Sequence, residues 1–113
     1  MDIKMENKEI KKFIEGTPFN NADVSCILSS GKNHKLVDSY SKLLRELKKI
    51  KKIRGILIKA EGNEDINPKK ILYHGEYHRK IQNKMENKSA NIIWGFKINN
   101  KLKKIKIKAV IVY

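Results

Sequence analysis

The chain has 113 residues, with 26 lysine and arginine residues against 12 aspartate and glutamate residues, which gives a formal net charge of +14 at neutral pH. A domain of this length buries roughly two-thirds of its unfolded surface, so it needs neither a disulfide nor a metal to fold. Its single cysteine, Cys26, excludes an internal disulfide and a multi-cysteine zinc site, and its apolar neighbours predict a buried structural thiol. The charge is typical either of attraction to acidic partners or of a lysine-rich composition without a function.

The first third of the chain is predicted to hold a helix and a strand. Residues 6–15 have the spacing of a short amphipathic helix, which Gly16 and Pro18 end. The compact apolar run at 23–29 predicts the first strand. Residues 1–15 are charged throughout, unlike a signal peptide. No apolar run approaches the ~20 residues of a membrane span, so we expect a cytoplasmic protein that does not bind membranes.

The middle of the chain is predicted to alternate helices with a strand. Apolar residues between 36 and 50 follow the 4-3-4-3 spacing of an amphipathic helix. Residues 53–60 form a nearly continuous apolar strand. An Asn-Pro pair at 67–68 then predicts the start of another helix, which runs to about residue 85. Gly75 inside this helix predicts a kink or a close backbone contact.

The last two elements are predicted to form a β-hairpin. Residues 90–98 and 102–112 have strand patterns, and the turn at 99–101 contains two asparagines, which tolerate a positive φ. The final strand alternates apolar residues with lysines, which is typical of one face on a core and one face in water. The predicted order is α-β-α-β-α-β-β. This order gives an α/β fold, an α+β two-layer sandwich whose four-stranded mixed sheet has helices packed on one face.

No arrangement of residues suggests catalysis, a cofactor or a metal. Gly31 and Lys32 lack the rest of a phosphate-binding glycine motif. His74 and His78 are four apart on the helix predicted at 67–85, and Glu64 and Asp65 are the nearest loop carboxylates. The helical glutamate of the metalloprotease motif is absent, so exposed histidines are the simpler interpretation. We therefore predict a protein that is not an enzyme and has no catalytic, cofactor or metal site.

A row of lysines is expected on the outer face of the hairpin: Lys97, Lys104, Lys106 and Lys108. Such a row often only protects a sheet edge from pairing with other strands. It would suit a nucleic acid if aromatic side chains stood beside it for base stacking. Trp94 and Phe96 are nearby in sequence, but their pattern is more typical of the core.

Several segments together resemble a known family. The strand at 90–95 (Ala-Asn-Ile-Ile-Trp-Gly), followed after a gap by an alternating strand, closely resembles the C-terminal domain of FtsZ, the tubulin-like GTPase of cell division. Residues 53–58 and 62–66 resemble its central strand and its loop of glycine and acidic residues. Residues 20–24 resemble the loop that reaches the nucleotide of the next subunit. The resemblance covers about residues 6–112.

The resemblance implies a single domain over residues 1–113, with a helix and connection at 1–18 and the FtsZ C-terminal-like domain at 19–113. The nucleotide-binding domain of the family has no counterpart in these residues, so GTP binding is not expected. Asn20 stands where the family has its first catalytic aspartate, and Asp23 matches the second. Since an amide cannot act as a carboxylate base, hydrolysis on a neighbouring subunit is not expected either.

The resemblance also implies a surface for protein–protein contacts. It would consist of the edge with Asn20, Asn21 and Asp23 and of the helix predicted at 67–85. The partner would be a second copy of the chain, in a homo-oligomer, or a tubulin- or FtsZ-like GTPase polymer. The alternative is a small basic protein that binds nucleic acid through the lysine-rich hairpin face. A third reading is a degenerate domain that keeps its fold without a function.

Overall fold

The structure, a computed structural model, describes residues 8–16, 19, 21–66 and 75–113. Four helices and four strands lie within them. In chain order they are α1 (Lys8–Ile14), α2 (Asn21–Ser29), β1 (His34–Val37), α3 (Tyr40–Lys49), β2 (Gly55–Gly62), α5 (Glu76–Lys84), β3 (Asn91–Ile98) and β4 (Lys106–Val112). None of these helices, within the described ranges, is long and apolar enough to cross a membrane.

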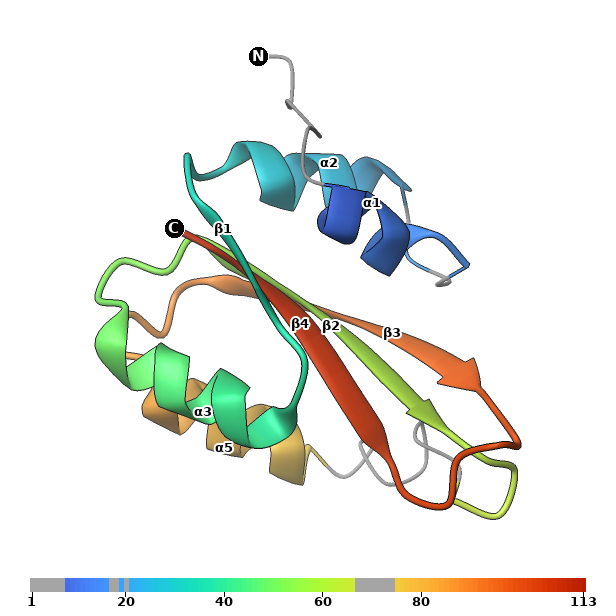
Figure 1. The fold of residues 1–113 in the computed structure, drawn as a ribbon. Helices are drawn as coiled ribbons and strands as arrows, with labels where there is room; N and C mark the ends of the chain where they lie inside the picture. Colours follow the sequence, from blue (N-terminus) through green and yellow to red (C-terminus); the bar gives the residue numbers. More distant parts are fainter. Residues whose placement is uncertain (1–7, 17–18, 20, 67–74) are drawn as a thin grey trace.

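The strands form one mixed sheet in the order β1-β4-β2-β3, as Figure 1 shows. β2 is parallel to β3 and antiparallel to β4, and β4 is antiparallel to β1. α1 and α2 cover one face of the sheet, and α3 and α5 cover the other. The predicted α/β class and its four-stranded mixed sheet are therefore confirmed.

Two hydrophobic clusters hold these layers together. Ile56, Ile58 and Ala60 of β2 pack with α3 and α5 on one face of the sheet. Leu57, which points the opposite way in the pleat, packs with α1 and α2 on the other face. All four side chains are fully buried. A strand covered on both faces has to be apolar at consecutive positions, which explains the continuous apolar run.

The apolar run at 23–29 is a helix, so its prediction as a strand is wrong. Val24, Ile27 and Leu28 are buried against the sheet, at the spacing of one helix face. Cys26 lies on the other side of α2 and is exposed, so the buried thiol is also wrong. A short apolar run does not distinguish a strand from a helix, because a few consecutive apolar residues fit either a buried strand or a helix that buries one face.

The first strand instead overlaps the start of the helix predicted at 36–50. His34–Val37 forms β1, and α3 begins only at Tyr40. Ser39 caps α3: its backbone is extended, with φ −152° and ψ 157°, and its hydroxyl accepts a hydrogen bond from the Lys42 amide at 3.2 Å. This cap stops the helix from reaching back into β1.

The predicted hairpin is also wrong, although both of its strands exist. β3 and β4 do not pair with each other, because β2 lies between them. The connection crosses the end of β2 and is fixed there by four hydrogen bonds, two of them between Asn100 and Glu64. The Asn99 amide donates to the Gly62 carbonyl at 2.8 Å, and the Asn63 side chain donates to the Leu102 carbonyl at 2.7 Å.

The observed order is therefore α-α-β-α-β-α-β-β over the described residues, and helices cover both faces of the sheet rather than one. Predicting α2 as a strand removed one of the two helices of the second face. Gly75 is not inside a helix: it precedes α5 with φ +70°, and a Cβ placed there would meet nothing within 4 Å. The predicted helix start at 67–68 and His74 lie outside the described residues.

Candidate interaction surface

Three of the four predicted lysines share one face of the sheet. Glu61 of β2 is paired with Lys97 on one side and with Lys106 on the other, while the neighbouring Lys59 is paired with Lys108. Paired residues of adjacent strands point to the same face. We call the four lysines the basic sheet patch: Lys59, Lys97, Lys106 and Lys108. Lys104 is exposed but precedes β4, so it does not belong to this patch.

The patch runs from the margin of α1 outward: the Lys59 side chain is only 12% exposed, whereas Lys97 and Lys106 are exposed. Towards the start of β2, this face carries Leu57 under the two helices. Two and four residues further on, the same face carries Lys59 and Glu61, whose ionised groups are 3.4 Å apart. The Lys59 ammonium also lies 5.8 Å from the centre of the Phe13 ring, within the range of a cation–π contact. The face thus changes from apolar to basic where its helical cover ends.

A groove of about 700 Å³ continues from this patch to the edge of the sheet at β1, between α1 and α3. Its described lining includes six cations against three carboxylates, an excess of three positive charges. The carboxylates are Glu9, Asp38 and Glu46. The cations are Lys12 from α1, Lys35 from β1, Lys42 and Arg45 from α3, Lys59 from β2, and Lys108 from β4.

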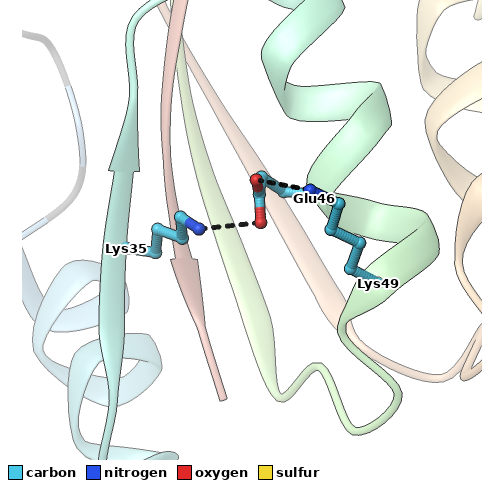
Figure 2. A network of polar contacts seen from close by, with 3 residues as sticks. All are labelled: Lys35, Glu46 and Lys49. Carbon is cyan, nitrogen blue, oxygen red and sulfur yellow. Dashed lines mark hydrogen bonds and ion pairs between the residues drawn. The ribbon is translucent and has the colours of Figure 1, made fainter.

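Some of these cations form ion pairs with carboxylates of the groove. Glu46 of α3 binds the Lys35 ammonium at 2.8 Å and lies 3.9 Å from that of Lys49, as Figure 2 shows. Asp38 binds Lys42 at 2.9 Å. The hydrogen bond with Lys35 lowers the pKa of the Glu46 carboxyl and raises the pKa of the Lys35 ammonium.

The Asp38 carboxyl has a lowered pKa for the same kind of reason. Its hydrogen bond with Lys42 is the main cause, and the charge of Lys108 adds a smaller effect. In both cases the positive charge of a neighbouring lysine favours the ionised form of the carboxyl and lowers its pKa. An acidic group from outside would meet the same field, since no ion pair among the described residues involves Lys12, Arg45 or Lys108.

The aromatic residues near the lysines in sequence lie on the other face of the sheet. Trp94 and Phe96 are stacked, with ring centres 6.2 Å apart, and pack against the cluster under α3 and α5. The Trp94 indole N–H donates to Nδ1 of His78 at 3.1 Å. His78 is therefore a hydrogen-bond partner of the core rather than a free ligand. Within the described residues, no group of three potential metal ligands comes together.

The predicted interaction edge is only partly described. Asn20 lies outside the described residues, and Asn21 is the first residue of α2. Asp23 is exposed in the first turn of α2. α2 packs on one face of the sheet and α5, which lies in the helix predicted at 67–85, packs on the other. The structure therefore does not bring Asp23 together with that helix.

Sequence reasoning missed most of the groove. Lys12, Lys35, Lys42 and Arg45 lie on three separate elements, α1, β1 and α3, and only the fold brings them to one edge. Lys59 carried a usable signal, because it is the one charged residue between Gly55 and Ala60 in an otherwise apolar strand. A charge in such a strand marks the point where one face loses its cover.

No protein-family model matches the chain, and no curated protein sequence is significantly similar to it. Solved structures of FtsZ do match its fold. An empty FtsZ dimer from M. jannaschii is 21% identical over 88% of this chain and 33% of that chain, with a TM-score of 0.57. A mutant FtsZ from M. jannaschii is 20% identical over 83% of this chain and 32% of that chain, with a TM-score of 0.61.

These likenesses show the fold of the chain, an α/β domain. More particularly, the chain has a fold like the FtsZ C-terminal domain, which confirms the resemblance seen in its sequence. It spans about a third of the FtsZ chains that it matches.

Proposed function

We propose that this domain is a non-catalytic interaction module of the cytoplasm that binds an acidic protein partner, a tubulin- or FtsZ-like polymer. The observation that carries the proposal is the basic sheet patch on a domain with the FtsZ C-terminal fold. One of the matched FtsZ structures is a dimer, which supports contacts between domains of this fold. Two copies of a chain with charge +14 repel each other, so an acidic partner is favoured over self-association.

The charge would act mainly on the rate of encounter. Lysines spread over an open face attract an acidic surface from a distance and orient it, which raises the association rate more than it tightens the complex. Salt screens such attraction over about 8–10 Å at physiological ionic strength. We therefore expect binding that weakens as salt is added.

Co-sedimentation with FtsZ polymer from the same organism tests the proposal. The domain is expected to pellet with assembled polymer at low salt and to pellet less as salt is raised. The double variant Lys97→Glu/Lys106→Glu should bind more weakly than the matched control Lys51→Glu/Lys52→Glu, which changes the net charge equally at exposed residues between α3 and β2. Absence of pelleting at every salt concentration would overturn the proposal.

Two other results would change its interpretation. If both double variants lose binding to the same extent, the basic sheet patch is not the contact and only net charge matters. If sedimentation analysis shows stable dimers of the domain alone, self-association replaces the acidic partner. The nucleic-acid alternative gains no support from the structure, because Trp94 and Phe96 face away from the lysines.

A further inference from the structure

The sheet has an open edge along β1. Among the described strands β1 pairs only with β4. Asn33 and Tyr113 exchange two backbone hydrogen bonds, of 2.8 and 2.9 Å, just before β1 begins. Because bonded and non-bonded pairs alternate in an antiparallel ladder, Lys35 and Val37 bond to β4 while His34 and Leu36 direct their backbone N–H and C=O groups outward.

These outward groups lie where the groove is. Leu36 is part of the groove lining, and no backbone hydrogen bond on its outer side occurs within the described residues. An unpaired strand edge is a template for another extended chain, which gains affinity from the main-chain hydrogen bonds. The edge is short, four residues, so it would hold a short segment.

Cations lie on both sides of this edge. Lys12 belongs to α1, which covers one face of the sheet, whereas Arg45 and Lys42 belong to α3, which covers the other. Successive side chains of an added strand point alternately to the two faces. A segment beside β1 would thus meet positive charge at consecutive positions, which favours a run of acidic residues over an alternating pattern.

We propose that the β1 edge and its groove bind a short, extended, acidic segment of a partner protein, which adds to the sheet as a further strand beside β1. The proposal deepens the proposed function and rests on it for the existence of a protein partner. It adds the surface and the conformation of the bound segment: main-chain hydrogen bonds to His34 and Leu36, with acidic side chains towards Lys12 and Arg45.

The test uses a fluorescein-labelled, end-capped peptide of eight residues, six glutamates and two valines, and measures its binding to the full chain by anisotropy at fixed ionic strength. The same peptide with every backbone amide N-methylated keeps the charge but loses all of its N–H donors, on both edges of the strand. We expect it to bind about tenfold more weakly or not at all, because the two hydrogen bonds that the peptide donates to the His34 and Leu36 carbonyls are lost. Equal binding of the two peptides would mean adsorption by charge alone and would overturn the proposal.

Arg45→Glu locates the site. Arg45 is exposed, so its replacement leaves the core intact. We expect about three- to tenfold weaker binding of the unmodified peptide, in the range of exposed charge pairs, whereas Lys51→Glu, with the same change in net charge, should have a smaller effect. Equal effects of the two variants would overturn the groove as the site. A competition experiment gives a second check, with a single-stranded oligonucleotide of equal charge and an unlabelled peptide as competitors. If the oligonucleotide displaces the labelled peptide at the lower concentration, the groove is not a peptide site.

The two proposals can fail separately. If the domain pellets with FtsZ polymer but neither peptide binds, the β1 edge is not used and the polymer contact stands. If the unmodified peptide binds with the expected dependence on Arg45 but the domain does not pellet, the acidic segment belongs to a different partner and the polymer proposal is wrong.

Discussion

Glu46 lies on α3 with 15% of its side chain exposed, and its carboxylate binds Lys35 of β1 at 2.8 Å. This pair joins the edge strand to the helix that follows it (Figure 2). The folded-state pKa of Glu46 is lowered below its ordinary value of 4.5, chiefly by the hydrogen bond from Lys35. A carboxyl with a lowered pKa stabilises the fold above the unfolded value and loses that contribution as the pH falls through the folded value.

Replacing this carboxylate should change the acid side of the stability curve. We expect Glu46→Gln to lower the urea midpoint at pH 7 and to leave it nearly unchanged well below pH 4.5, where the wild-type carboxyl is protonated as well. Urea unfolding from pH 2.5 to pH 7 measures the difference. Glu86→Gln, at an exposed residue without an ion pair among the described residues, is the control. A difference from wild type that does not shrink in acid would contradict the expectation.

Gly31 fits against the backbone beside β4. A Cβ at this residue would lie 2.9 Å from the Tyr113 carbonyl oxygen and 2.9 Å from a Val112 methyl carbon. A carbonyl held in the ladder with Asn33 cannot move away without breaking those hydrogen bonds. We expect Gly31→Ala to cost about 1–3 kcal/mol, as overpacking does.

Chemical denaturation of Gly31→Ala checks this cost, with Lys32→Ala at the exposed neighbouring residue as the control. A midpoint equal to that of the wild type would show that the turn before β1 can shift away from β4. In that case the β1 edge would be less rigid than the proposed binding of a further strand requires.

Single residues were the least predictable level. The position of Cys26 in an apolar run indicated burial, yet α2 turns it outward, because the assignment of helix or strand decides which residues share a face. The position of Lys59 in an apolar strand was equally unusual, and it proved to mark the end of the helical cover. Neither outcome follows from the residue alone, since both depend on which elements lie above the sheet.

At the scale of elements, long or regular patterns were predicted well. The continuous apolar strand at 53–60 is β2, shifted by two residues, and the 4-3-4-3 pattern contains α3. Pairing was predicted less well. Two strand patterns joined by an Asn-rich turn are typical of a hairpin, but the residues at 99–105 are enough to cross over β2. The residues of the turn do not show that an earlier strand, β2, lies between β3 and β4.

The central place of β2 has a direct test. Adjacent strands are about 4.8 Å apart, so β3 and β4 lie about twice that distance from each other, beyond the reach of strong backbone NOEs. We expect cross-strand NOEs from Ile58 to both Trp94 and Ala109, and none between Trp94 and Ala109. Backbone NOEs that link β3 directly to β4 would restore the hairpin and contradict the sheet order.

For the whole molecule, two clusters on opposite faces of one sheet should unfold together. Ile56 and Leu57 are neighbours in β2 and belong to different clusters, so neither face can lose its packing without disturbing the strand of the other. We expect a single cooperative transition. Trp94 fluorescence reports the face under α3 and α5, and the exposed Cys26, labelled with a second fluorophore, reports α2.

The two probes should give coincident urea curves. If the label on α2 responds at lower urea than Trp94, the layer of α1 and α2 detaches from a sheet that stays folded, and the expectation of one cooperative unit is wrong. The variant Cys26→Ser/Ser29→Cys carries the label at another exposed position of the same helix. It would show whether the attached label itself loosens α2.

The molecule as a whole was predicted at the level of class and fold, because the strand pattern at 90–95 suggested a fold that FtsZ structures about 20% identical to the chain do share. The second helical layer and the groove were not predicted, because they are formed by elements far apart in the sequence.

β4 is made after every other described element, yet it lies inside the sheet between β1 and β2. A ribosome that adds about 5–20 residues per second therefore leaves β1 without its partner for several seconds. Throughout that time β1 and one side of β2 can accept strands from neighbouring nascent chains. The many lysines, which repel one another between chains, would then protect the protein during its own synthesis, before any partner is met.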